Sequence, residues 1–360
     1  MNAITEQQSL AHWPLSPEQR AVLVAAEVNE SDTQQAALAQ VEVMVVDIQG
    51  ALDSSRLEQA LSDLRQQHEA LSTALKSVAG YRGLRHQALE DLPAIEWRHE
   101  DLRGSGDKKA LLNDFLNNYR ESLKRRPIAL ESGELLRPAL LQTGETTWVL
   151  VLAVSALVAD RGSLLSLFSA LVDAYEPRGG TDDESALQYS QFIEWRASLE
   201  NDDDAEEGRE YWQNHQQHAE QAGVCRLPTM QANRHDVRVE HEYVACPLEP
   251  DLVARIDSLA DELQVSAEVV LQAAWWALLA RISSNECVLG GWQHDCRQDY
   301  EVMQGAFGLF DKVLPVLVEG VADSDFSSWI TRLAEQLEAH TQAQEYWSID
   351  ALPDKRHLAA

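Results

Sequence analysis

The alternation of apolar and polar residues predicts strands in both halves of the chain. Val41–Gly50 partly alternates and is rich in β-branched residues, which is typical of a strand. Thr147–Val154 is a continuous β-branched run that includes Trp148, and it predicts a buried strand. Further strands are predicted near Arg238–Ala245 and at Val313–Val318.

Helical spacing of apolar residues follows each of the first two strands. Asp53–Leu75 is predicted as one helix, started by a capping box of Ser55 and Glu58, with an apolar stripe at Leu57, Ala60, Leu61, Leu64, His68 and Leu71. The later strand ends at Ser155, and Ser163 is predicted to cap an apolar helix that runs to about Tyr175. A strand, a loop and a helix therefore follow one another around residues 155–163. Short loops between rigid elements often contain catalytic or binding residues.

The second half contains three predicted helices, at Asp251–Leu263, Ser266–Ile282 and Ser327–His340. The middle one is apolar nearly all round, so we expect it to be buried. Trp275 and Trp276 lie in it and are interpreted as core residues, with the lining of a pocket as the alternative.

Composition changes between the halves and suggests domain boundaries. We predict an N-terminal subdomain at 12–176, an acidic connector with helices at 177–235, and a C-terminal subdomain at 236–360. Each half is expected to be a sheet with helices on it, so the fold class is α/β (α+β).

Charge and cysteine content narrow the classes of partner and compartment. A net charge of -30 argues against nucleic acid and anionic membranes, although acidity can also reflect solubility or a salty habitat. No apolar run approaches the roughly 18–20 residues that span a bilayer, and the first residues are not typical of a signal peptide, so we expect a cytoplasmic protein. The cysteines form no C-x-x-C pair, and no metal site is predicted from Cys225, Cys246, Cys287 and Cys296.

Several segments, in order, resemble the core motifs of nonribosomal peptide synthetase condensation domains. They are PLSPEQR (Pro14–Arg20), QHEALST (Gln67–Thr73), AVSALVADRGS (Ala153–Ser163), YSQFIEW (Tyr189–Trp195), Tyr211-Trp212, Val265–Gly290 and GLFDKVLPVLV (Gly308–Val318). The resemblance implies two chloramphenicol acetyltransferase-like halves in a V, with a tunnel in which two carrier-bound substrates meet. It also implies an incomplete second half, because the family continues past the segment matching Trp347–Leu352.

The catalytic motif of that family, HHxxxDG, matches at Ala153–Ser163 without its histidines. Ser155 and Ala156 occupy the histidine positions, and Ala156 has no group that could act as a base. Asp160 matches the motif aspartate, and Arg161 replaces the glycine. The resemblance implies a structural pair between Asp160 and Arg297, so no catalytic residue is assigned.

A partial resemblance to heterocyclization domains, whose motif is DxxxxDxxS, rests on Asp160 and Ser163. Ser163 is explained equally well as a helix cap. Ser155 as a nucleophile lacks a nearby histidine in sequence and a G-x-S-x-G turn. Lys312 replaces the asparagine that the family usually has before the last strand.

The remaining candidates are weaker. His68 is interpreted as a structural histidine, and His294 with Cys296 is too isolated to be a metal site. The basic run Lys124, Arg125 and Arg126 is a candidate contact for an acidic carrier protein, with an ordinary solvated turn as the alternative.

Two functions follow from the resemblance. The favoured one is a condensation-like domain without normal amide-bond formation that serves as a docking platform for a carrier protein or tailoring enzyme. The alternative is an enzyme that uses the same tunnel for noncanonical acyl transfer, dehydration or heterocyclization. No bound cofactor is expected, and the phosphopantetheine arm of a carrier protein is the expected visiting group.

Overall fold

The computed structural model describes residues 12–29, 40–104, 107–176, 187–199, 202, 205–222, 246–283, 287–321 and 325–348. The chain divides into two compact units. The first comprises Met1–Asp202, Asp295–Lys312 and Ser348–Asp350, and the second Asp203–His294, Val313–Trp347 and Ala351–Ala360. The boundaries predicted after residues 176 and 235 stay a prediction, and the predicted strand near Arg238–Ala245 lies outside the described residues.

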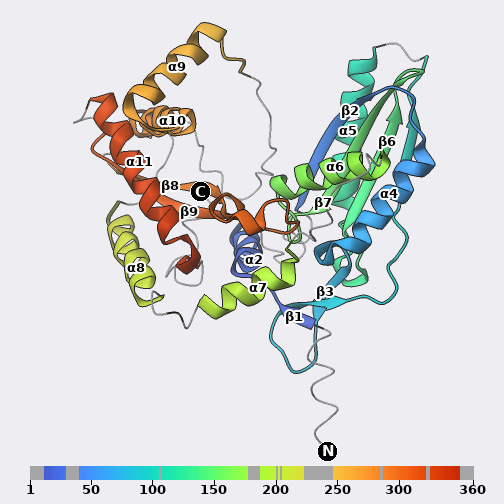
Figure 1. Cartoon of the computed structure of the whole chain (residues 1–360), viewed down its shortest axis with the longest axis horizontal. Helices are drawn as coiled ribbons and strands as arrows, with labels where there is room; N and C mark the ends of the chain where they lie inside the picture. The colour runs from blue at the N-terminus through green and yellow to red at the C-terminus, as the bar shows by residue number, and fades with distance from the viewer. Residues whose placement is uncertain are drawn as a thin grey trace, which may run out of the picture. The chain divides into compact units, whose positions relative to one another are not determined.

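Helices and strands both contribute to the described structure (Figure 1). The α-helices are α2 (Pro17–Asn29), α4 (Ser54–Gln67), α5 (Lys108–Arg125), α6 (Arg161–Tyr175), α7 (Tyr189–Ser198), α8 (Ala205–Ala222), α9 (Pro250–Leu263), α10 (Ala267–Ser283) and α11 (Phe326–Gln342). The strands are β1 (His12–Pro14), β2 (Val41–Gln49), β3 (Thr73–Ser77), β4 (Leu84–Ala88), β5 (Arg98–Asp101), β6 (Leu136–Gln142), β7 (Thr147–Ser155), β8 (Cys287–Asp295) and β9 (Asp311–Glu319).

A four-stranded sheet forms the centre of the first unit, in the order β2-β7-β6-β5. β7 pairs antiparallel with both β2 and β6, while β5 and β6 are parallel. Side chains of β7 alternate between two apolar clusters, because successive residues of a strand point to opposite faces. Leu150, Leu152 and Val154 pack with α4 and α6, and Val149, Val151 and Ala153 pack with α5.

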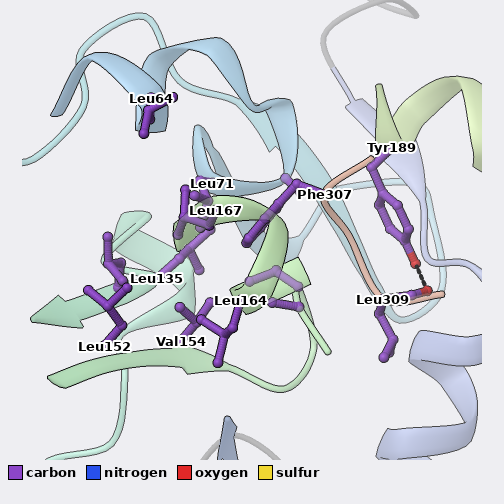
Figure 2. Packing of buried hydrophobic residues seen from close by; sticks show 14 of the residues in the cluster. Leu64, Leu71, Leu135, Leu152, Val154, Leu164, Leu167, Tyr189, Phe307 and Leu309 are labelled. Atoms are coloured by element: carbon purple, nitrogen blue, oxygen red, sulfur yellow. Dashed lines mark hydrogen bonds between the residues drawn. The ribbon is translucent and has the colours of Figure 1, made fainter. Parts of the chain in front are cut away.

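The larger cluster links the sheet to segments far away in sequence (Figure 2). Leu164 and Leu167 of α6 pack beside Leu152 and Val154, and Phe307 joins the same cluster. Tyr189 is fully buried and donates its hydroxyl hydrogen bond to the carbonyl of Leu309 at 2.8 Å. The segment 295–312 is thus built into the core of the first unit.

The helix predicted at Asp53–Leu75 is observed as α4, which is shorter than the spacing of apolar residues suggests. Asp53, and not Ser55, is the N-cap of α4, because its carboxylate accepts a hydrogen bond from the Arg56 N–H. α4 ends at Gln67, where His68 adopts an extended backbone, and Thr73 then starts β3 in register with β4. Strand pairing therefore outweighs the continuing helical pattern.

The second unit contains α8 to α11 and most of the paired strands β8 and β9. The strand predicted at Val313–Val318 and the three predicted helices are confirmed as β9, α9, α10 and α11. Trp276 is buried, but Trp275 is 57% exposed, with Leu271, Leu278 and Ile282 on the same exposed stripe. The expectation that α10 is buried all round is wrong, because within the described residues the neighbouring elements cover one face.

No single helix among the described residues has both the length and the apolar character needed to cross a membrane. α9 and α10 reach these thresholds only when taken together, and they are bent by 102° relative to each other.

Candidate functional site

The loop 156–160 joins β7 to α6, and backbone hydrogen bonds fix its path. The Ala156 N–H donates to the carbonyl of Gln40 at 3.0 Å, and the Val158 and Ala159 N–H groups donate to the carbonyl of Ser155 at 3.0 and 3.2 Å. Ser155 is fully buried, and its hydroxyl oxygen accepts from the Leu157 N–H at 3.3 Å. An inaccessible hydroxyl in this position is a poor nucleophile.

The carboxylate of Asp160 is saturated with hydrogen-bond donors. One oxygen, Oδ1, accepts from the Ser163 N–H at 2.7 Å and from Arg297 Nη2 at 2.6 Å. The other oxygen, Oδ2, accepts from the N–H groups of Phe310 and Asp311 at 2.8 and 3.1 Å. Asp160 is 3% exposed, so it anchors the loop and leaves no lone pair directed at a substrate.

Arg297 completes this buried network. Its Nε donates to Asp295 at 2.9 Å, and its Nη1 donates to the Ser163 hydroxyl oxygen at 2.9 Å and to the Ala306 carbonyl at 3.3 Å. Burial by itself lowers the pKa of Arg297, but the charge of Asp160 and the hydrogen bonds to both aspartates raise it overall. The structure thus brings together Asp160 and Arg297, the two residues that the sequence suggested as a structural pair.

Ser163 is not the cap of α6. Asp160 is the N-cap, and Ser163 lies in the first turn. The Ser163 hydroxyl donates to the carbonyl of Gly308 and accepts from the Gly308 N–H at 3.0 Å and from Arg297. All of its hydrogen-bonding capacity is used in holding α6 against the segment 295–312.

The close approach of Arg297 to α6 requires a glycine at position 162, and the sequence pattern did not reveal this. A Cβ atom placed on Gly162 would lie 2.9 Å from Cζ of Arg297 and 3.1 Å from Asp295 Oδ2. The guanidinium therefore occupies the space that a side chain would need. The only signal of this close approach in the sequence is a glycine two residues after the motif aspartate.

The first sequence motif supports the loop from a second side. Gln19 donates from Nε2 to the Leu157 carbonyl at 2.6 Å, so its Oε1 is the atom that accepts from His86 Nε2 at 2.9 Å. His86 Nδ1 then accepts from the Thr73 hydroxyl at 3.3 Å. Burial lowers the pKa of His86 to about 3, which keeps the ring neutral in this arrangement. The PLSPEQR segment thus has a positioning role that sequence reasoning missed.

A second buried charge cluster surrounds Lys312, the residue noted as a departure from the family. Glu18 Oε1 lies 3.4 Å from Lys312 Nζ and 3.3 Å from Arg196 Nη2. Burial raises the pKa of Glu18, but the charges of Arg196 and Lys312 outweigh it and lower the pKa below 4.5. Burial lowers the pKa of Lys312 below 10.5, and the nearby charge of Arg196 lowers it further. Lys312 is bound to Glu18 and buried, so its position favours a structural role.

The other predicted residues lie away from this network or take part in packing. The His68 ring lies 5.3 Å from Phe307, and burial lowers its pKa. Burial raises the pKa of the Cys296 thiol to about 12, which makes it unreactive. His294 is buried, and within the described residues no group of three or more metal-binding side chains gathers.

The basic run is found at the end of α5, on the surface. Lys124 Nζ lies 2.7 Å from Glu121, and Arg126 Nη1 lies 2.9 Å from Glu96. Arg125 is exposed, and it has no ion-pair partner among the residues that the structure describes. Two of the three charges are therefore partly offset by neighbouring carboxylates.

The comparison with protein families decides the identity of this scaffold. The family model of the condensation domain matches residues 9–348, which is nearly the whole chain. The chain belongs to the condensation domain family. That the AVSALVADRGS segment is a degenerate form of the family's catalytic motif stays a prediction.

Relatives of this condensation domain are segments of far larger proteins. Bacitracin synthase 3 of Bacillus licheniformis is 24% identical over 353 residues, covering 98% of this chain but 5% of the synthase. The chain thus spans about a twentieth of the length of that relative.

Two solved structures share the fold over almost the whole chain. The SgcC5 protein of Streptomyces globisporus, in complex with a naphthyl ethanediol and sucrose, has a TM-score of 0.74 at 18% identity and covers 92% of this chain and 74% of its own. A mutant starter condensation domain of rhizomide synthetase, in complex with C8-CoA and Leu-SNAC, has a TM-score of 0.74 at 17% identity and covers 98% and 76%. The predicted α/β fold of the condensation type is confirmed.

Proposed function

We propose that this chain is a condensation-like domain of nonribosomal peptide biosynthesis that does not form amide bonds by the family's histidine route. Its role is to dock a carrier protein or a tailoring enzyme of the same assembly line. The phosphopantetheine arm of a carrier protein is the visiting group that such a domain would meet.

Ala156 is the observation that carries this proposal. It stands where the resemblance places the histidine beside the attacking amine, and a methyl group cannot accept a proton. Neither neighbour replaces the histidine. Ser155 is fully buried, and the carboxylate of Asp160 is bound to Arg297 and to backbone N–H groups. The loop is therefore preserved as a structural element although its base is absent.

The heterocyclization alternative requires Asp160 and Ser163 to be available to a substrate. Both side chains are buried, and every described hydrogen bond that they make is to the protein itself. A catalytic use of either group would first have to break the contacts that join α6 to the segment 295–312. These contacts therefore support docking over heterocyclization.

We expect no amide product when the protein is offered an acyl-loaded and an aminoacyl-loaded carrier protein. Product measured by mass spectrometry should form at the rate found without the protein. The variant Ser155→His/Ala156→His should stay inactive as well, because an imidazole cannot fit the fully buried position 155 without displacing the core. Amide formation well above the uncatalysed rate by the unaltered chain would contradict the proposal.

The surface at the end of α5 is the candidate contact for an acidic carrier. Lys124, Arg125 and Arg126 form the exposed basic group there, and Arg120 is exposed one turn earlier on the same helix. On a chain with a net charge of -30, such a local excess of cations gives an acidic partner a favoured approach.

Calorimetric titration at low and high salt tests the docking function. We expect a carrier protein from the same biosynthetic system to bind with micromolar affinity, more weakly at high salt. Changing Lys124, Arg125 and Arg126 to glutamate should weaken low-salt binding by roughly tenfold or more. The matched control changes Arg82, Lys109 and Arg255 to glutamate, because these exposed residues alter the net charge equally at other sites.

Equal affinity of the two triple variants would remove the α5 surface from the proposal. Absence of binding to every carrier protein and tailoring enzyme of the system would remove the docking function itself.

A further inference from the structure

The exposed side of α10 is apolar in the middle and carries one charge near each end. The helix packs against α9 and α11 (Figure 1), and its residues Val270, Ala273 and Trp276 are buried in the core of the second unit. The opposite side, which we call the α10 face, consists of the exposed residues Glu268, Leu271, Ala274, Trp275, Leu278, Arg281 and Ile282.

The α10 face has the spacing of a helix that packs lengthwise against another helix. Glu268, Leu271, Trp275, Leu278 and Ile282 follow one another at alternating intervals of three and four residues. This heptad spacing keeps one row of side chains directed at a neighbouring helix over several turns. Single exposed apolar residues need no partner, but a continuous apolar row is typical of an interaction site.

The α10 face also differs in charge from the rest of this acidic chain. It contains one negative residue, Glu268, and one positive residue, Arg281, so its net charge is zero, whereas the whole chain carries -30. Among the described residues, neither of these two side chains has a hydrogen-bond or ion-pair partner. Two copies of so acidic a chain repel each other, and they approach most easily where the excess negative charge is missing.

The order of residues on the α10 face is complementary to itself in the reverse direction. In an antiparallel pair of α10 helices with a two-fold axis between positions 274 and 275, residues equally far from the axis lie level with each other. Leu271 then lies level with Leu278 of the second copy, and Glu268 lies level with Arg281 of the second copy. Because a two-fold interface uses the same surface of both copies, each of these matches occurs twice.

Side-chain size is complementary at the centre of the α10 face. Ala274 and Trp275 lie on either side of the two-fold axis, so the smallest and the largest side chains of the face are level with each other. An alanine leaves room for a close approach of two helices, and a tryptophan buries about 150–250 Å² when it is covered. Trp275 has the largest exposed fraction of the large apolar residues on this helix.

We propose that the α10 face binds the α10 face of a second copy of this chain in an antiparallel, two-fold symmetric contact. The contact covers Leu271, Trp275 and Leu278 of both copies. α10 has 17 residues, so the contact is about 25 Å long. An interface along one helix is small, below about 1,200 Å² in total, and the dimer is therefore reversible with a Kd in the micromolar range. This contact lies on the second unit and does not rest on the proposed docking function.

Sedimentation velocity over about a hundredfold range of protein concentration tests the self-association, because a reversible dimer forms by mass action. The unaltered chain should shift from monomer to dimer, and Trp275→Ser should raise the dimer Kd by about tenfold or more. The matched control is Leu165→Ser, because Leu165 is 56% exposed, against 57% for Trp275, but lies on α6. Its dimer Kd should equal that of the unaltered chain.

Exchange of the two charges tests the antiparallel register. Glu268→Arg places an arginine level with Arg281 at both ends, and Arg281→Glu places a glutamate level with Glu268, so each variant alone should dimerise about tenfold more weakly or worse. An equimolar mixture of the two variants should recover dimerisation, because opposite charges again face each other at both ends. Glu262→Arg, an exposed change on α9, is the control and should leave the Kd within about twofold.

A chain that stays monomeric over the whole concentration range, whatever else the α10 face binds, would overturn the proposal. Equal dimerisation of Trp275→Ser and Leu165→Ser would overturn it as well, and so would a mixture of the two charge variants that associates no better than either alone. Carrier docking is measured by calorimetry on the unaltered chain, so its failure and the failure of self-association are distinguished.

Discussion

Replacing Asp160 by alanine is expected to lower the free energy of unfolding by about 3–5 kcal/mol. The substitution leaves the guanidinium of Arg297 buried without its closest carboxylate, and it removes the acceptor of the Ser163, Phe310 and Asp311 N–H groups. Denaturant unfolding followed by fluorescence gives the measurement.

The control for Asp160→Ala is Asp173→Ala, an exposed position on the same helix, which should change stability by less than about 0.5 kcal/mol. The double variant Asp160→Ala/Arg297→Met should be less destabilised than the sum of its single changes, because no buried cation is then stranded. Equal unfolding midpoints for Asp160→Ala and Asp173→Ala would show that the pair does not stabilise the fold.

Glu18→Gln is expected to destabilise the first unit by a similar amount, about 3 kcal/mol or more. The change removes the negative charge between Arg196 and Lys312, and leaves two buried cations facing a neutral amide. The exposed residue Glu90 provides the control Glu90→Gln, which should unfold like the unaltered chain. Adding Lys312→Met to Glu18→Gln should restore part of the loss, and no restoration would contradict the cluster's electrostatic role.

The carboxylate of Glu18 is expected to make the protein less stable as the pH falls. Its pKa in the folded state is lower than its ordinary value of 4.5, so its contribution is complete above about 4.5 and is lost as the pH falls through the folded value. The unaltered chain should therefore lose more stability than Glu18→Gln between about pH 5 and pH 3. Parallel stability curves for the two proteins would argue that Glu18 is not paired in the folded state.

The Asp160–Arg297 pair and the Gln19 hydrogen bond explain how the loop 156–160 keeps its shape. Asp160 and Arg297 hold α6 to the segment 295–312, and Gln19 holds the loop from the side of α2. Asp160, Arg297 and Gln19 are all buried. The scaffold and the chemistry of the family are therefore separable, which makes a docking domain physically reasonable.

Periodicity was enough to place several elements of this protein. β2, β7, β9, α9 and α11 follow from runs of alternating or helically spaced apolar residues, because each buries one face in a way that the chain itself encodes. The order of the motifs likewise predicted the condensation fold, and the family model and the solved structures confirm it. The absence of a base at Ala156 was visible directly.

The tertiary structure alone decided which elements and side chains contact one another, because the hydrophobic periodicity of the sequence does not contain this information. The end of α4 at Gln67 and the 57% exposure of Trp275 depend on which strand or helix packs beside them, and no local pattern contains that information. The occupied lone pairs of Asp160 depend on donors of Arg297 and Phe310, which lie more than a hundred residues away in sequence. Long-range contacts determine that the Asp160 carboxylate is bound within the protein, because burial and hydrogen bonding are properties of the folded chain.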